Sequence, residues 1–195
     1  MPLIGVLAIQ GDFDAHRRRL EQLGAQVRLV RKPDELEDLD GIVIPGGESS
    51  TMLKFLEHEG FFEKLRNFVR LKPAFGTCAG AILLAQDVEN PAQKSLGALD
   101  IGIRRNAYGR QLDSHICTSD QNGHGRPFEM VFIRAPKISR VGKDVQVLAK
   151  SDNDPVWVRQ GKTMAATFHP ELSEDDHVHR EFLKLVTSKS YSASN

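Results

Sequence analysis

The chain has 195 residues, enough for one domain that buries about 70% of its unfolded surface without a disulfide or structural metal. Basic and acidic residues number 26 each, and this zero formal charge argues against binding to nucleic acid or to an anionic membrane. No apolar run approaches the ~20 residues of a membrane span, and the N-terminus lacks the pattern of a signal peptide. We therefore expect one cytoplasmic domain over residues 1–195.

Apolar runs and helical patterns alternate through the first part of the chain. Strands are expected at residues 3–9, 26–30 and 41–44, and helices at residues 15–23, 33–39, 52–59 and 61–71. Asp12 or Asp14 can cap the first helix, and Gly24 suits its C-terminal end. The rhythm predicts an α/β fold with a doubly wound, mostly parallel sheet and helices on both faces.

The third expected strand runs into the loop of residues 45–51, which contains Gly46 and Gly47. Ligands bind at the carboxyl ends of strands in such folds, and adjacent glycines let backbone N–H groups approach a ligand closely. A phosphate loop is not indicated, because the Gly-x-x-x-x-Gly-Lys pattern is absent. An ordinary turn, with Ser49, Ser50 or Thr51 capping the next helix, is the alternative.

A cysteine occupies a second turn, between a short apolar strand at residues 72–75 and a helix that begins near Ala79. Gly76 and Gly80 lie two residues before and after Cys78, the spacing of a strained strand-to-helix corner that exposes a nucleophile. The helix N-terminus favours a thiolate there. If the glycine loop faces a ligand, the N–H groups of Gly47 and Ala79 can form an oxyanion hole. A packed, inert cysteine remains the alternative.

After an irregular stretch at residues 87–97, the pattern changes to short alternating runs. Strands are expected at residues 99–103, 115–117, 128–133, 145–148 and 156–158, which predicts an appended, mostly antiparallel section. Arg105 and Arg134 lie near strand ends. Each could be a surface or ion-paired arginine, or it could bind the carboxylate of a ligand. Cys117 is interpreted as a packed residue and His124 as a structural one.

A further strand at residues 164–167 leads into Phe168, His169, Pro170 and Glu171. Pro170 favours an extended backbone at His169, so the side chains of His169 and Glu171 are expected on the same side. A histidine oriented by a carboxylate can serve as the base for a cysteine nucleophile. In the final expected helix, residues 175–189, His177 and His179 diverge and do not predict a metal pair.

The motifs Gly-Thr-Cys-Ala-Gly at residues 76–80 and His-Pro-Glu at residues 169–171 resemble class I glutamine amidotransferase domains, whose fold is flavodoxin-like. Nearly the whole chain resembles one branch, the glutaminase subunits of pyridoxal 5′-phosphate synthase. The segments that carry this resemblance are residues 5–13, 45–49, 105–111 and 131–136. Tyr108, where phenylalanine is expected, and His115 depart from the family pattern.

The resemblance implies a glutaminase that converts L-glutamine to L-glutamate and ammonia. Cys78 would be the nucleophile, His169 the base and Glu171 the acid that orients it, with a γ-glutamyl thioester as intermediate. The residues implied to contact the substrate are Gly46, Gly47, Glu48, Arg105, Ile133 and Arg134. No metal or organic cofactor is implied. The implied partner is a (β/α)8-barrel synthase subunit, in a hetero-oligomer that makes vitamin B6, and the loop with Gln10 would face it.

Two other functions stay open at this point. The chain could be a different cysteine hydrolase or peptidase on the same scaffold. It could also be a non-catalytic subunit that binds a partner through the same fold, with Cys78 inert.

Overall fold

The computed structural model describes residues 1–107, 114–118 and 127–188, without the side chains of residues 114, 115, 117 and 118. Tyr108, the expected loop around His124, and the side chains of His115 and Cys117 therefore lie outside the described residues. No helix within the described ranges is long and apolar enough to cross a membrane.

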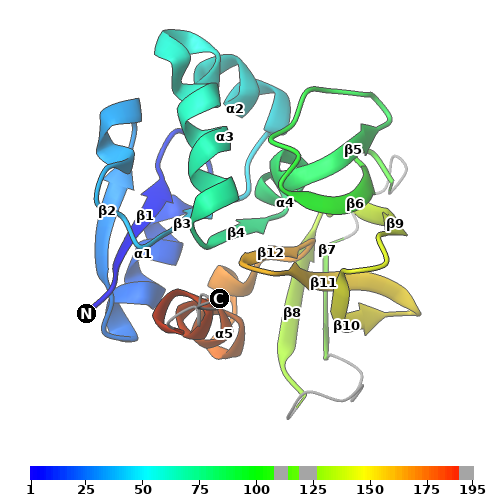
Figure 1. Cartoon of the computed structure of the whole chain (residues 1–195). Coiled ribbons are helices and arrows are strands. Elements are labelled where there is room, and N and C mark those ends of the chain that lie inside the picture. Colours follow the sequence, from blue (N-terminus) through cyan, green and yellow to red (C-terminus); the bar gives the residue numbers. More distant parts are fainter. Residues whose placement is uncertain (108–113, 119–126, 189–195) are drawn as a thin grey trace, which may run out of the picture.

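A seven-stranded sheet forms the centre of the molecule, in the order β10-β11-β12-β4-β3-β1-β2 (Figure 1). The five strands from β12 to β2 are parallel, whereas β11 and β10 continue the sheet in antiparallel fashion. The strands are β1 Leu3–Leu7, β2 Gln26–Val30, β3 Gly41–Ile44, β4 Ala74–Thr77, β10 Gln146–Ser151, β11 Asp154–Gln160 and β12 Thr163–Ala166. The expected doubly wound sheet, mostly parallel, is confirmed.

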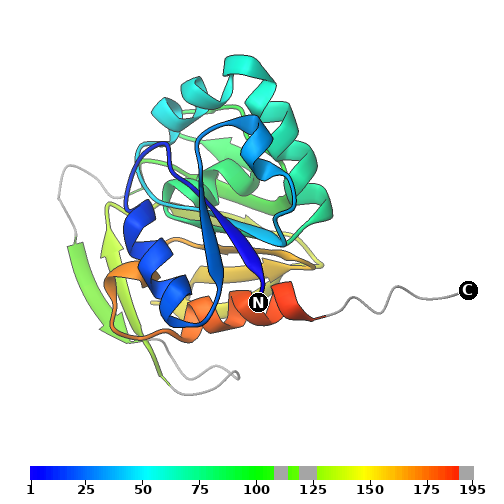
Figure 2. The same cartoon turned by 90° about the vertical axis from the view of Figure 1, so that its left-hand side faces the viewer.

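Helices cover both faces of this sheet (Figures 1 and 2). α1 and α5 lie against one face, and α2, α3 and α4 pack on the other. The helices are α1 Phe13–Gln22, α2 Ser49–Leu56, α3 Phe61–Leu71, α4 Ala79–Leu84 and α5 His177–Thr187, with 3-10 turns at Pro33–Leu36, His58–Gly60 and Pro170–Leu172. Pro33–Leu36 replaces the short α-helix that the sequence predicts for residues 33–39.

The end of α1 follows the sequence prediction, and its beginning does not. Gly24 has a φ of +86°, and its N–H donates to the carbonyl of Glu21, while the N–H of Ala25 donates to that of Leu20. This pair of bonds is a Schellman motif, which glycine allows at low cost. Asp12 occupies the N-cap position, but its side chain makes no capping hydrogen bond.

Two smaller sheets form the appended section. β6 Leu99–Arg104 pairs with β5 Ala85–Glu89 in parallel and with β9 Lys137–Val141 in antiparallel orientation. β7 Ser114–Thr118 and β8 Glu129–Ile133 form an antiparallel pair that projects beside the end of β12 (Figure 1). The stretch from residue 87 was expected to be irregular; its first part belongs to β5, and β9 was not expected.

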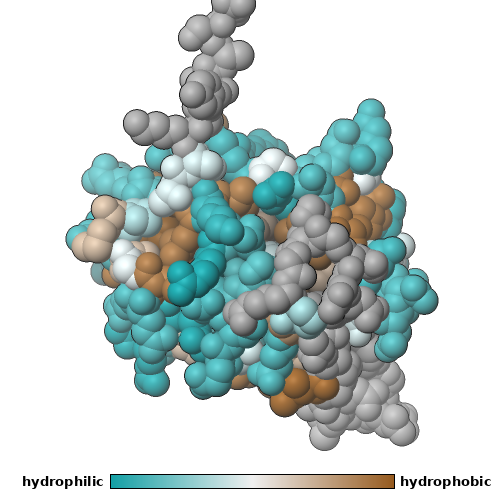
Figure 3. All heavy atoms as spheres, turned by 90° about the horizontal axis from the view of Figure 1, so that it is seen from below, coloured by the Kyte–Doolittle hydropathy of each residue, from teal (hydrophilic) through white to brown (hydrophobic). Residues whose placement is uncertain are grey.

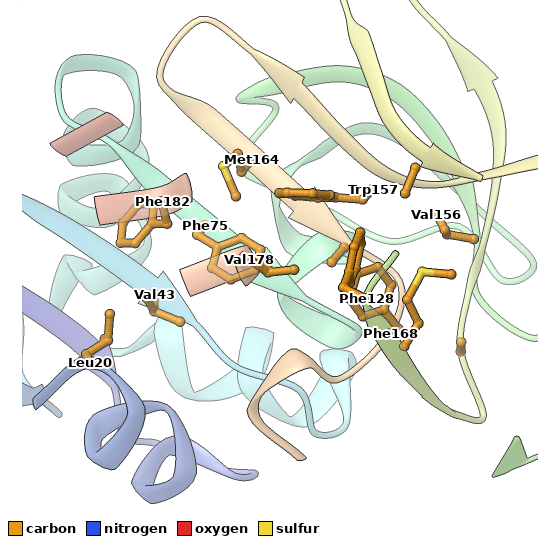
Figure 4. Packing of buried hydrophobic residues seen from close by; sticks show 14 of the residues in the cluster. Leu20, Val43, Phe75, Phe128, Val156, Trp157, Met164, Phe168, Val178 and Phe182 are labelled. Atoms are coloured by element: carbon orange, nitrogen blue, oxygen red, sulfur yellow. The ribbon is translucent and has the colours of Figure 1, made fainter. Parts of the chain in front are cut away.

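The largest aromatic cluster lies under the face covered by α1 and α5. Phe75 of β4 stands near its centre, beside Phe182 and Val178 of α5, and Leu20 of α1 lies at its edge (Figure 4). The ring centroids of Phe75 and Phe182 are 5.7 Å apart. In the view from below, hydrophilic residues dominate the surface and hydrophobic residues form separate patches (Figure 3). The cluster fixes β4, and so the turn that follows it, relative to both helices.

Candidate active site

Cys78 lies at the sharp corner between β4 and α4, as the sequence predicts. Its φ of +49° and ψ of −106° are unusual for a residue other than glycine, and the residue is buried. A Cβ atom on Gly80 would lie 1.9 Å from the carbonyl oxygen of Ile44, and one on Gly76 would lie 2.5 Å from the Gly80 backbone. Only glycine fits at both positions, which explains the spacing around the cysteine.

His169 and Glu171 converge beyond the end of β12. Nδ1 of His169 lies 2.7 Å from Oε1 of Glu171, and the Glu171 side chain is fully buried. The expected pairing is confirmed, but its geometry differs: Pro170 begins a 3-10 turn, so Glu171 does not lie on an extended segment. The N–H of His169 donates to the carbonyl of Val131 on β8, which anchors the histidine to the β7–β8 pair.

The histidine and the cysteine are neighbours across Gly46. A Cβ atom on Gly46 would lie 2.6 Å from Cε1 of His169 and 3.4 Å from Cβ of Cys78. The N–H of Cys78 donates to the carbonyl of Ala166, which joins the ends of β4 and β12. The structure therefore brings Cys78, His169 and Glu171 together at the carboxyl ends of three parallel strands, with Gly46 at the end of β3.

The electrostatics of the group favour a charged histidine. Burial lowers the pKa of His169, but hydrogen bonds with Cys78 and Glu171 outweigh burial and raise that pKa to about 10. Burial raises the pKa of Glu171, yet His16 beside it and the hydrogen bond from His169 lower it overall. At neutral pH the pair is an imidazolium and a carboxylate, with the Nδ1 proton directed at Glu171 and Nε2 left for the sulfur.

The loops after β1 and β3 pack against each other at the edge of this site. The N–H of Glu48 donates to Oε1 of Gln10 over 3.0 Å. A Cβ atom on Gly11 would meet the carbonyl oxygen of Gly46 at 1.8 Å, and Gly47 has a φ of +139°. The glycines are thus needed for close contact between two loops as well as for any approach of a ligand.

Glu48 has a structural task that the sequence did not indicate. Its carboxylate caps α2, accepting hydrogen bonds from the backbone N–H and hydroxyl groups of Ser50 and Thr51. Capping by Ser49, Ser50 or Thr51, which the sequence analysis gave as an alternative, is not what the structure shows. The Ser50 hydroxyl lowers the pKa of Glu48 most; with the other bonds it outweighs burial and brings the value to about 2. The carboxylate therefore stays charged.

The remaining residues predicted to contact glutamine or an oxyanion come from three segments of the chain. Nη2 of Arg105, largely buried, lies 3.3 Å from Oε1 of Glu48, so these two form an ion pair. Ile133 ends β8, the strand that anchors His169, and Arg134 follows with a φ of +46°. Ala79, whose N–H was predicted to face an oxyanion, is the first residue of α4.

The sequence analysis did not anticipate two buried histidines behind Glu171: it left His16 out and considered His179 only as a metal ligand beside His177. His16 of α1 and His179 of α5 are fully buried, with His16 Nδ1 2.9 Å from His179 Nε2. They are 163 residues apart, so no local spacing links them. The available signal was the position of His16 four residues before Leu20, on the buried stripe of its helix.

A metal ion is not needed to explain the arrangement. Ligand atoms of Asp12, His169 and Glu171 lie within 4.8 Å of one another. However, both ring nitrogens of His169 are engaged, one with Glu171 and the other with Cys78. We therefore interpret the group as a nucleophile, a base and an acid.

Comparison with known proteins agrees with this geometry. The model of the SNO glutamine amidotransferase family matches residues 6–188. The pyridoxal 5′-phosphate synthase subunit PdxT of Koribacter versatilis (strain Ellin345) is 65% identical over 183 residues, which are 94% of this chain and 95% of the relative. The PdxT of Solibacter usitatus (strain Ellin6076) is 51% identical over 192 residues, 95% and 100% of the two chains.

A solved structure leads to the same family. A crystal structure described as a glutamine amidotransferase superposes with a TM-score of 0.87 at 46% sequence identity, covering 94% of this chain and 98% of that one. The family match spans nearly all of the chain, including the Cys78 corner and the His169–Glu171 turn. The chain belongs to the SNO glutamine amidotransferase family.

Proposed function

We propose that this chain is the glutaminase subunit of a pyridoxal 5′-phosphate synthase and hydrolyses L-glutamine to L-glutamate and ammonia. Residues 1–195 would form one glutamine amidotransferase domain. One observation carries the proposal: the buried Cys78, His169 and Glu171 meet in a chain that is 65% identical to a PdxT subunit. The proposal retains the cytoplasmic location expected from the sequence.

In the first half of the proposed reaction, the sulfur of Cys78 attacks the side-chain carbonyl carbon of glutamine. The His169 imidazolium, held by Glu171 through Nδ1, gives its Nε2 proton to the amide nitrogen. The carbon–nitrogen bond then breaks, ammonia leaves, and a γ-glutamyl thioester remains on Cys78.

In the second half, a water molecule attacks the thioester. His169, now neutral, takes a proton from that water, and the carbon–sulfur bond breaks. Glutamate leaves, and the cysteine–histidine pair returns to its starting charge. One glutamine and one water are thereby converted to one glutamate and one ammonia.

Both tetrahedral intermediates carry a negative oxygen, which needs donors. The proposed donors are the backbone N–H groups of Gly47 and Ala79, and loss of one such donor typically costs ~2.7–4 kcal/mol of transition-state stabilisation. The first N–H groups of a helix have no partner within it, which leaves that of Ala79 available.

The proposed contacts with the rest of glutamine come from two sides of the site. The first group comprises Gly46, Gly47 and Glu48, and the second comprises Arg105, Ile133 and Arg134. Since the carboxylate of Glu48 already caps α2, its proposed contribution is mainly to hold the loop and Arg105 in place.

Ammonia would pass to a synthase subunit, proposed to be a (β/α)8 barrel. The proposed docking element is the loop after β1, because Gln10 links it directly to the Gly46–Gly47 loop through the N–H of Glu48. Docking of the synthase subunit on this loop can therefore change the position of the Gly46–Gly47 loop through one hydrogen bond.

The test is glutamate release from glutamine by the full chain, with and without the synthase subunit. We expect slow release alone, faster release with the partner, and none from Cys78→Ala. The circular dichroism spectrum of the variant should match that of the unaltered chain. Persistent release by Cys78→Ala would refute the proposed nucleophile, and cleavage of peptides in place of glutamine would favour a peptidase.

A further inference from the structure

The acid of the proposed active site is backed by a closed polar cluster that the reaction scheme does not use. Oε1 of Glu171 binds His169, while Oε2 lies 3.3 Å from Nε2 of His16. The same Nε2 lies 3.1 Å from the hydroxyl of Thr77, the residue before Cys78. Nδ1 of His16 then contacts Nε2 of His179 at 2.9 Å. The side chains form a chain from the sulfur to α5.

The inner members of this chain of side chains have no surface exposed to solvent. His16 and His179 have no exposed surface, Thr77 has none, and the ring of Phe75 meets both histidines edge-on, at 6.4 and 6.2 Å between centroids. Within the described residues, Oε2 of Glu171 has no hydrogen bond of good geometry. His16, with Nε2 at 3.3 Å, is therefore the group placed to serve that oxygen, which needs a partner because it is buried.

The protons of the two histidines can be assigned from their surroundings. Burial lowers the pKa of both rings, so each is neutral and carries one N–H. If Nδ1 of His16 carried the proton, the lone pair of its Nε2 would point at the carboxylate. Nε2 of His179 would then have to accept the hydrogen bond, which leaves an N–H on Nδ1 of His179 that has no partner among the described residues. We therefore place the protons on Nε2 of both rings, so that His179 donates to His16 and His16 faces Glu171 and Thr77.

We propose that His16, held by His179 and Thr77, is a positioning residue that keeps Glu171 charged and oriented toward His169. The inference rests on the proposed glutaminase function and deepens it. His16 touches neither Cys78 nor glutamine in this scheme; it acts through the second oxygen of the acid. The active group would then extend from Cys78 through His169 and Glu171 to His16 and His179.

Within the part of the chain that the structure describes, three titratable groups come close to this acid. His169 comes from its own turn, His16 from α1, and Asp12 lies at the start of α1. His179 of α5 lies behind His16, and the nearby charge of Arg19 adds to the effect of burial in lowering the pKa of His179. Without the N–H that His16 directs at Oε2, the buried carboxylate of Glu171 loses a donor that favours its charged form, so its protonation moves to higher pH. A protonated Glu171 no longer attracts the Nδ1 proton of His169, and the base loses its orientation.

The test uses the full chain with its synthase partner and measures kcat and KM for glutamine across pH. In His16→Leu we expect kcat to fall about 10- to 100-fold, the loss typical when a residue that orients a metal-binding histidine is removed. KM should stay unchanged, and the acidic limb of the kcat/KM profile should move up by about one pH unit. His16→Gln, whose amide nitrogen can replace Nε2, should recover most of both losses.

The matched control is His177→Gln, on α5, the helix that carries His179. His177 packs against Phe128 and Trp157, outside the polar chain, so this variant can lose stability but should keep the wild-type pH profile. Equal profiles for His16→Leu and His177→Gln would overturn the proposal, as would a His16→Gln variant no better than His16→Leu. If the unaltered chain releases no glutamate with its partner, the proposed function fails instead. Should His16→Leu not fold, His179→Phe takes its place: the proposal predicts the same upward move of the acidic limb in that variant, and a wild-type profile overturns it.

Discussion

Replacing Gly46 with alanine would place a methyl group between Cys78 and His169. The new Cβ would lie 2.6 Å from Cε1 of His169 and 3.3 Å from its Nδ1. Ordinary contact begins near 3.4 Å, so the ring must retreat by about 0.8 Å, and a displacement near 1 Å can cost ~100-fold in rate. A hundredfold loss corresponds to about 2.7 kcal/mol of transition-state stabilisation. Gly46 does not have a positive φ, so the backbone itself tolerates alanine.

Two assays separate this effect from a loss of glutamine binding. The first is kcat/KM for glutamine with the synthase subunit, expected to fall about 100-fold. The second is the rate at which a small alkylating reagent modifies Cys78, which does not depend on glutamine contacts and should also fall. The control is Gly24→Ala, which strains a positive φ with no atom within 4 Å of the new Cβ, and should lower stability without changing either rate. Gly46→Ala within threefold of the wild-type rate, about 0.7 kcal/mol, would refute the reasoning.

Three further predictions concern stability and charge. Gly80→Ala should destabilise the fold by about 1–3 kcal/mol or more in urea unfolding, because its Cβ would meet the Ile44 carbonyl oxygen at 1.9 Å; an unchanged midpoint would contradict the packing of the corner. Glu48→Ala should cost about 1 kcal/mol through loss of the α2 cap. The pKa of Glu48 is lowered to about 2, so the stability that its carboxylate contributes is complete above the unfolded pKa near 4.5 and is lost as pH falls toward 2. If the free energy of unfolding depends on pH equally in the wild type and in Glu48→Ala, this contribution is contradicted. The His169 ring should titrate near pH 10 by nuclear magnetic resonance in the wild type and nearer its usual value in Cys78→Ala. The stabilisation that comes from its charge should be lost as pH rises through 10, and a wild-type midpoint near 6.5 would disprove the charged state of His169 at neutral pH.

Local patterns predicted the parts of the fold whose causes are local. β2, β3 and α3 have the predicted bounds because each is a short apolar or amphipathic run between clear turn residues. The Cys78 corner was predictable since the glycine spacing is itself a steric requirement. β5 and β9 were missed because their pairing partner, β6, lies elsewhere in the sequence and their own patterns are weak.

The site shows the same division. His169 and Glu171 are two residues apart, so their convergence could be predicted, although the 3-10 turn that produces it could not. Glu48 was expected to face glutamine, and its role as a cap was not anticipated because serine and threonine are the commoner caps. His16 and His179 meet only because α1 and α5 cover the same face of the sheet (Figure 2), which depends on the folded topology.

The central claim is that the Cys78 sulfur bonds to the side-chain carbon of glutamine. The most direct measurement exposes the full chain to a glutamine-mimicking electrophile and locates the label by peptide mass spectrometry. One label per chain on Cys78, prevented by excess glutamine and slowed in Gly46→Ala, is the predicted result. Labelling elsewhere, or labelling of Cys78 that glutamine does not affect, would contradict it.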